Sequence, residues 1–346
     1  MSEIETIEIT APTGARARVL TYGARLQSLT APDRHGAFDT IVLGFPDPEA
    51  YRRDTAFIGG VIGRYANRIA DGHFSLDGRE VVLLANDGAN HLHGGPGGFD
   101  KRDWRIAGAD SRSVTLTLVS EDGDQGYPGC LSVSARYAFE SDGALSIDLT
   151  ATTDASTIVN LTHHAYFNLA GQRRGGSIGD HWLRLAADRF TPVDAAAIPT
   201  GEIRGATGTP FDFASPHRIG ERWAADDPQI AMMAGYDHNM VLVPSAGAVR
   251  LVATLFDPPS GRVLDLMTGA PGLQFYSGNA LASPDIGFHG SRYAAREGLC
   301  LEPQFFPDSP NRPGFPSAGL DPDIVYHQEI RLRFRTARDL NEAFES

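Results

Sequence analysis

Apolar and polar residues alternate strictly over residues 131–140. A side-chain period of two is that of a β-strand with one buried face. After a Ser-Asp-Gly turn at residues 141–143 the alternation resumes through Leu145, Ile147 and Leu149. The two segments therefore predict an antiparallel hairpin. The apolar face of its first strand carries Leu131, Val133, Ala135, Tyr137 and Phe139.

The same pattern recurs elsewhere, which favours an all-β fold. Residues 249–255 alternate, a Pro-Pro-Ser-Gly turn follows at 258–261, and 263–267 continue the pattern, as do 330–335. The 38 glycines and 22 prolines are typical of a chain with many turns. Only two short helices are expected, one starting at Ser215-Pro216 and ending before Asp226-Asp227-Pro228, the other near 340–344. No linker or repeat divides the chain, so we predict one all-β domain over residues 1–346, with large antiparallel sheets packed face to face.

Charge and cysteine content exclude several classes of binding partner and fold. The 43 acidic and 30 basic residues give a net charge of −13, which disfavours nucleic acid and anionic membranes. Two cysteines, Cys130 and Cys300, are too few for a disulfide framework. The acidic start of the chain is unlike a secretory signal, and no segment has the roughly 20 apolar residues of a membrane helix. The composition leaves small neutral ligands open, and we expect a cytoplasmic enzyme.

Five segments break the alternation with clustered polar residues, and such segments often mark sites. Glu302 follows an apolar run and lies among prolines and phenylalanines, an environment that raises the pKa of a carboxyl group. A carboxylate of this kind and a histidine form a proton-transfer pair suited to neutral pH. Nucleotide-binding glycine motifs and the serine-hydrolase elbow are missing from the sequence. The five segments are residues 63–69, 90–95, 160–169, 235–239 and 300–308.

Two histidine pairs lead to different expectations. If residues 90–93 form a strand, His91 and His93 point to the same face, as in a metal site. His163 and His164 are adjacent, so on a strand they face opposite ways and one of them enters a given cleft. A metal enzyme is therefore one alternative, although no glutamate follows His93 at the short spacing that cupin-type sites use.

The ordered motifs resemble those of the aldose 1-epimerase (galactose mutarotase) family over nearly the whole chain. They include Asn90-His91-Leu92-His93-Gly94-Gly95, Thr162-His163-His164, Gly235-Tyr236-Asp237-His238-Asn239 and Glu302-Pro303-Gln304. The resemblance implies a β-supersandwich that interconverts the α and β anomers of free aldoses such as galactose and glucose, without cofactor or metal. The remaining matching segments are residues 22–26, 67–69, 98–101 with Trp104, 124–129, 210–213 and 274–279, and the matches around His164 and Glu302 extend over residues 160–169 and 302–311.

The resemblance also implies residue roles. Glu302 falls at the position of the general base and His164 at that of the general acid. Pro303 and Phe305 depart from the family pattern beside the base, so we expect them to affect sugar preference. His163 also departs from that pattern, and we keep His164 as the acid. The implied sugar-binding residues are Asn67, Arg68, His93, Asp237 and Gln274.

Other functions remain open at this point. A glycoside hydrolase would need a second acid opposite Glu302, for which Asp237 is a candidate. A hexose-6-phosphate 1-epimerase would need extra cationic groups for the phosphate, and the acidic balance disfavours it. A non-catalytic carbohydrate-binding module would bind sugar without turnover. For the enzyme we expect a monosaccharide substrate and a monomer or homodimer.

Overall fold

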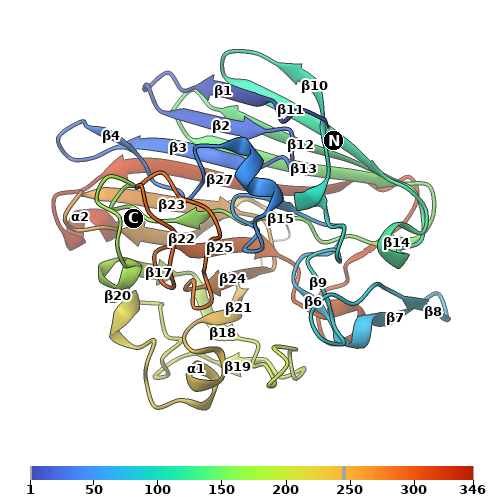
Figure 1. The fold of residues 1–346 in the computed structure, drawn as a ribbon. Coiled ribbons are helices and arrows are strands. Elements are labelled where there is room, and N and C mark those ends of the chain that lie inside the picture. Colours follow the sequence, from blue (N-terminus) through green and yellow to red (C-terminus); the bar gives the residue numbers. More distant parts are fainter. Residues whose placement is uncertain (1, 244–246, 346) are drawn as a thin grey trace.

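The computed structural model describes residues 2–243 and 247–345, and antiparallel sheets dominate it (Figure 1). This confirms the predicted all-β class. The largest sheet has nine strands, in the spatial order β10 (Arg105–Ala109), β11 (Ser113–Ser120), β12 (Leu131–Phe139), β13 (Leu145–Thr153), β27 (Tyr326–Thr336), β23 (Arg262–Thr268), β22 (Arg250–Phe256), β17 (Trp182–Leu185) and β20 (His217–Arg218).

The predicted hairpin is the pair β12 and β13, with Phe139 opposite Leu145 in the ladder. Its inward residues Tyr137 and Ile147 are fully buried, because the period of two places them on the core face. The segments at 249–255 and 263–267 form β22 and β23, and that at 330–335 lies in β27. A bulge between Leu251 and Ala253 interrupts the alternation of β22.

Two smaller sheets and four two-stranded pairs make up the other strands of the described residues. The six-stranded sheet has the order β16 (Tyr166–Phe167), β25 (Leu299–Gln304), β24 (Gly272–Tyr276), β21 (Asp237–Leu242), β18 (Ala187–Phe190) and β19 (Arg204–Gly205). The four-stranded sheet has the order β1 (Thr6–Thr10), β2 (Arg16–Leu20), β3 (Leu26–Pro32) and β4 (Phe38–Thr40). The pairs join β5 (Val61–Ile62) to β15 (Thr162–His163), β6 (Arg68–Ile69) to β9 (His91–Leu92), β7 (His73–Leu76) to β8 (Arg79–Val82), and β14 (Thr157–Ile158) to β26 (Gly319–Leu320).

Helices are short. The α-helices of the described ranges are α1 (Pro228–Met233) and α2 (Leu340–Phe344), and the second was predicted. Single 3₁₀ turns join several strands. These turns are η1 (Pro48–Arg52), η2 (Ala70–Gly72), η3 (Phe99–Lys101), η4 (Asp124–Gly126), η5 (Ile178–Asp180), η6 (Ile219–Glu221) and η7 (Ser309–Asn311).

The helix predicted from Ser215-Pro216 is wrong. That segment forms β20 and the turn η6 instead. The Asp-Asp-Pro sequence that was taken to end a helix begins one, because the side chain of Asp227 accepts hydrogen bonds from the amides of Gln229 and Ile230. Pro228 then occupies the first helical turn, where its missing amide hydrogen costs nothing.

One hydrophobic core joins the three larger sheets. It contains Val19 of the four-stranded sheet, Leu149 of the nine-stranded sheet and Phe275 of the six-stranded sheet. On β25, Leu299 and Leu301 point into this core. Alternation therefore sends Cys300 and Glu302 to the opposite face of the six-stranded sheet. That face carries the pocket described below.

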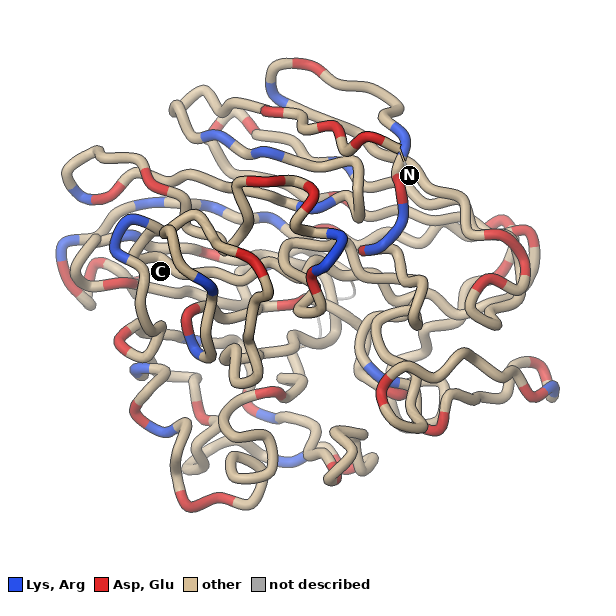
Figure 2. Tube along the Cα trace, viewed as in Figure 1, with Lys and Arg blue, Asp and Glu red and all other residues tan. Residues whose placement is uncertain are grey.

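Basic and acidic residues are interspersed along the outer strands and loops (Figure 2). Over residues 2–243 and 247–345, no helix is long and apolar enough to cross a membrane.

Candidate active site

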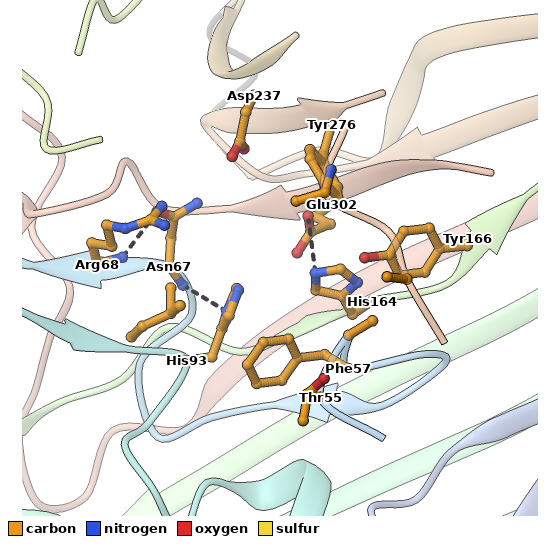
Figure 3. Close-up of a pocket in the computed structure, with 14 residues that line it drawn as sticks. Thr55, Phe57, Asn67, Arg68, His93, His164, Tyr166, Asp237, Tyr276 and Glu302 are labelled. Atoms are coloured by element: carbon orange, nitrogen blue, oxygen red, sulfur yellow. Dashed lines mark hydrogen bonds and ion pairs between the residues drawn. The ribbon is translucent and has the colours of Figure 1, made fainter. Parts of the chain in front are cut away.

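A pocket of about 240 Å³ lies on the outer face of the six-stranded sheet. This volume is just below the range for drug-sized ligands, so the pocket fits a small molecule. Figure 3 shows His164 and Glu302 on one side, with Asn67, Arg68 and His93 facing them. The lining residues are Thr55, Ala56, Phe57, Asn67, Arg68, Leu92, His93, His164, Tyr166, Asp237, Tyr276, Ala280, Ala282 and Glu302.

Glu302 projects from β25 and is only 2% exposed. Burial raises the pKa of its carboxyl group well above the usual range, and the negative charge of Asp237 adds to the rise. Its Oε2 atom has no hydrogen-bond partner among the described residues. Leaving a buried carboxylate oxygen without a hydrogen bond costs free energy, and a polar ligand in the pocket could supply the missing partner.

His164 lies between β15 and β16, where its backbone is fixed from both sides. Its amide donates to the carbonyl of Gly60, and its carbonyl accepts from the amide of Gly59. The ring places Nε2 3.8 Å from Oε1 of Glu302. Burial lowers the pKa of His164 to about 4. The two side chains are close enough to share the binding of one small ligand.

The adjacent histidines do face opposite ways, as predicted. The ring of His163 packs edge-on against Tyr137 of the nine-stranded sheet, with centroids 5.8 Å apart. His164 lines the pocket instead. Burial also lowers the pKa of His163, to about 3, so this ring is a neutral member of the core.

Asp237 and Gln274 are brought together by the sheet. Gln274 lies opposite Glu302 in the β24–β25 ladder, and Asp237 lies opposite Tyr276 in the β21–β24 ladder. Nε2 of Gln274 donates to Oδ1 of Asp237 at 2.7 Å. Burial raises the pKa of Asp237. Asp237 therefore enters the pocket with one oxygen already bonded.

His93 and Asn67 hold each other across the pair β6 and β9. The amide of Asn67 donates to Nδ1 of His93 at 3.1 Å, and the amide of His93 donates to the carbonyl of Asn67. Because Nδ1 accepts, Nε2 of the neutral ring carries the proton and is a donor. Burial lowers the pKa of His93 well below its usual value, which keeps the ring neutral.

The glycine after His93 is required by a close backbone approach. A Cβ atom on Gly94 would overlap the carbonyl oxygen of Gly63, and its φ of +83° favours glycine. His93 itself has a φ of 51°, an uncommon angle for a residue with a side chain. The local chain therefore turns sharply at the point where His93 enters the pocket.

Arg68 supplies the guanidinium of the pocket. It lies on β6, and its Nε donates to Oδ2 of Asp87 at 2.7 Å. Of the described residues that line the pocket, Arg68 is the cationic one, and Asp87 partly neutralises it. The neighbouring Arg64 is buried and donates to backbone carbonyls, including those of Pro128 and Gly129, so it has a structural role.

The expectation that His91 and His93 share one face is wrong. The strand β9 ends at Leu92 and the backbone of His93 is left-handed, so the alternation that would place both rings on one face stops before His93, and His93 lines the pocket whereas His91 does not. Both ring nitrogens of His91 are occupied, Nδ1 by the carbonyl of Leu84 and Nε2 by the hydroxyl of Tyr127, each at 2.7 Å. The arrangement does not bring these two rings to one metal ion.

Several pocket residues were not identified from the sequence. Phe57 packs against the rings of His93 and His164, with centroids 4.6 and 5.8 Å away. It lies in a loop, where no periodic pattern points to it. Tyr276 could have been found, because it is two residues from Gln274 on β24 and so shares its face.

Pro303 and Phe305 do not line the pocket. The carbonyl of Pro303 accepts a hydrogen bond from the hydroxyl of Thr162. Phe305 packs near Tyr326 on the other side of β25. Their effect on sugar preference, expected from their place beside Glu302 in the chain, has no direct contact to support it.

A buried ion-pair network fixes the loop that carries Phe57. The guanidinium of Arg25 is fully buried and reaches Asp54 at 2.8 Å and Asp100 at 3.2 Å. It also donates to the carbonyl of Ile58 at 2.7 Å. The chain from Asp54 to Ile58 is thereby tied to Arg25, which lies between β2 and β3, and its Phe57 packs against His164.

Comparison with known proteins places the whole chain beside aldose epimerases. A family model described as aldose 1-epimerase matches residues 5–333. An aldose 1-epimerase of Escherichia coli K12 is 41% identical over 304 residues, which is 88% of this chain and 86% of that protein. The galactose mutarotase of Bos taurus is 41% identical over 324 residues, covering 93% and 92% of the two chains.

Solved structures give the same result. An aldose epimerase homologue from Caenorhabditis elegans superposes with a TM-score of 0.89 at 32% identity, covering 97% of this chain and all of that one. A galactose 1-epimerase from Lactobacillus acidophilus has a TM-score of 0.85 at 30% identity, with 97% and 96% covered.

Proposed function

Because this chain belongs to the aldose 1-epimerase family, a family of isomerases, we propose that it interconverts the α and β anomers of free aldoses such as galactose and glucose. The observation that carries this proposal is the pairing of His164 and Glu302, 3.8 Å apart, beside a pocket sized for one small polar ligand. Opening of a hemiacetal removes a proton from the C1 hydroxyl and delivers one to the ring oxygen, and a base and an acid beside each other can catalyse both transfers.

Glu302 is the general base and His164 the general acid. Glu302 removes the proton from the hydroxyl on C1 while His164 donates a proton to the ring oxygen. The bond between C1 and the ring oxygen breaks as the C1 carbonyl forms, so no free alkoxide develops. Rotation by about 180° around the C1–C2 bond presents the other face of the aldehyde, and the same transfers in reverse close the ring.

Burial sets the protonation of this pair. It disfavours charge on both groups, raising the pKa of Glu302 and lowering that of His164. Between these values the pair carries one proton. The reactive form places that proton on His164 and leaves Glu302 ionised, and its net charge equals that of the form with the proton on Glu302.

The remaining polar residues hold the sugar during rotation. His93 donates from Nε2, Arg68 donates from its guanidinium, and Asp237 accepts with the oxygen that Gln274 leaves free. Asn67 positions His93 through its backbone. Holding the open chain in place favours reclosure over escape.

The charges of the pocket support a neutral sugar over a sugar phosphate. Its lining includes the carboxyl groups of Asp237 and Glu302, and the guanidinium of Arg68 is already paired with Asp87. A hydrolase role for Asp237 has less support, because Gln274 occupies one of its oxygens.

We further propose that residues 1–346 act as one domain without cofactor or metal. In support, β27, near the end of the chain, lies between β13 and β23 in the same sheet. The pocket is formed by one chain, which is compatible with a monomer or a homodimer. The free thiols of Cys130 and Cys300 support a cytoplasmic location.

Polarimetry on freshly dissolved α-galactose and α-glucose tests the function. We expect the protein to speed the approach to anomeric equilibrium, and the variant Glu302→Gln to lose nearly all of this effect while still binding sugar. Rates equal to the spontaneous rate for every aldose would refute an epimerase. Sugar binding without any turnover would assign a carbohydrate-binding module instead.

A further inference from the structure

Cys300, His164 and Glu302 bring a sulfur, a nitrogen and an oxygen donor together, with His164 and Glu302 lining the pocket and Cys300 buried behind it. One donor atom of each residue lies within 4.8 Å of the other two. Sγ of Cys300 lies 3.4 Å from Nδ1 of His164. Cys300 precedes Glu302 by two positions on β25, so both side chains leave the strand on the same face.

This donor set and its spacing fit a zinc ion. Thiolate, imidazole and carboxylate are the three common zinc ligands, with bond lengths of about 2.0–2.3 Å. Three atoms no more than 4.8 Å apart always have a point within about 2.8 Å of each, so shifts of less than about 1 Å per side chain would complete the bonds.

Three other features make this a site rather than a chance cluster. All three side chains are buried, with residue exposures of 0% for Cys300, 4% for His164 and 2% for Glu302. Oε2 of Glu302 lacks a partner among the residues that the structure describes, so an oxygen ligand is free. The pocket in front of the cluster leaves room for water as a fourth ligand.

We propose that Cys300, His164 and Glu302 form a binding site for Zn²⁺ or another thiophilic divalent cation, and that the bound cation inhibits the enzyme. Binding forms a metal–sulfur bond as the thiol proton leaves to solvent. The cation also occupies His164 and Glu302, the two residues that would otherwise exchange protons with the sugar. The inhibition rests on the proposed epimerase function, whereas the binding does not.

A second group of possible ligands, Asp148, His327 and Glu329, lies on the surface of the nine-stranded sheet. His327 is exposed, and Asp148 is already contacted by Ser146 at 3.1 Å and Arg136 at 3.7 Å. This second group has no sulfur ligand and does not lie in the pocket described above. The experiment therefore removes this group with His327→Gln, and removes the other thiol with Cys130→Ser.

The test uses untagged full-length protein carrying Cys130→Ser and His327→Gln as the reference. Isothermal calorimetry with Zn²⁺ should show one site, and Cd²⁺ should give the ultraviolet absorption of a cadmium–thiolate bond. Adding Cys300→Ser should remove that absorption and weaken Zn²⁺ binding at least about tenfold, as expected on losing a ligand. Glu302→Gln should weaken Zn²⁺ binding while keeping the cadmium–thiolate signal.

Galactose should compete with Zn²⁺ for binding. Zn²⁺ should slow mutarotation in the reference protein, and after Cys300→Ser the same inhibition should need at least about tenfold more Zn²⁺. Zn²⁺ binding that is unchanged by Cys300→Ser, or no cadmium–thiolate signal in the reference protein, would overturn the proposal. Zinc binding in a protein that does not turn over any aldose would refute the epimerase function alone. Turnover without zinc binding would refute the metal site alone.

Discussion

Nε2 of His164 lies 3.8 Å from Oε1 of Glu302, although the two residues are 138 positions apart in the sequence. Their separate elements, the turn after β15 and the strand β25, meet only in the folded protein. Most of the expected behaviour of the enzyme follows from this pair and the groups around it.

Replacing either member of the pair should remove most catalysis. We expect Glu302→Gln and His164→Asn each to lower kcat by about 10²–10⁴-fold, the range for loss of one proton-transfer group. The double variant should be little worse than the poorer single variant, because the two groups act in one step. Proton NMR of anomer exchange measures these rates. Fully additive losses would contradict a concerted pair.

Activity should depend on pH in a bell shape. As the pH falls through about 4, the pKa of His164, a second proton enters the pair and Glu302 cannot act as a base. As the pH rises through the raised pKa of Glu302, the pair loses its only proton and His164 has none to donate. The measurement is kcat/KM against pH; a flat profile across both limbs would count against this pair.

Asp237 should tune Glu302 as well as bind sugar. Its negative charge contributes to the raised pKa of Glu302, so Asp237→Asn should lower that pKa and move the alkaline limb to lower pH. KM should rise, since Asn replaces an acceptor with a weaker one. Asp188→Asn, an exposed change on β18, is the matched control and should leave the limb in place.

The buried Arg25 should contribute strongly to stability. Arg25→Met leaves Asp54 and Asp100 without their partner, and breaking a buried ion pair in this way costs about 3–5 kcal/mol. Urea unfolding measures the change. The exposed pair of Arg18 and Glu8 provides a control, and Arg18→Ala should cost less than about 1 kcal/mol.

Activity should not depend on added metal. Dialysis against a chelator should leave the mutarotation rate unchanged or raise it by removing inhibitory zinc. Loss of activity on chelation, restored by a metal ion, would contradict the proposed acid–base mechanism. The rate before and after dialysis, with metal content measured in parallel, is the required comparison.

Local sequence patterns were sufficient for strands such as β12, β13 and β27. Their alternation records which face is buried, and a turn sequence fixes the hairpin. The wrong helix at Ser215 shows the limit of this reasoning, since Asp-Asp-Pro can end one helix or cap the next. Tertiary context decides between these outcomes.

Site residues that lie in sequence motifs could be predicted, whereas contacts that depend on how the strands pair could not. His164, Glu302 and Asp237 were all named from the sequence and do line the pocket. The contact between Gln274 and Asp237 depends on the pairing of β21 with β24, which no local pattern gives. Phe57 enters through a loop held by Arg25, and His93 through a left-handed turn, so neither orientation follows from alternation.

The position of β27 has a consequence for how the protein is made. Until this strand is available, β13 and β23 each present an open edge with unpaired backbone groups. The nascent chain must therefore wait for residues 326–336 before its largest sheet can close, and such long-range pairing folds slowly. Chaperones that shield strand edges should matter most for this protein during synthesis, and shortened chains that end before β27 should aggregate.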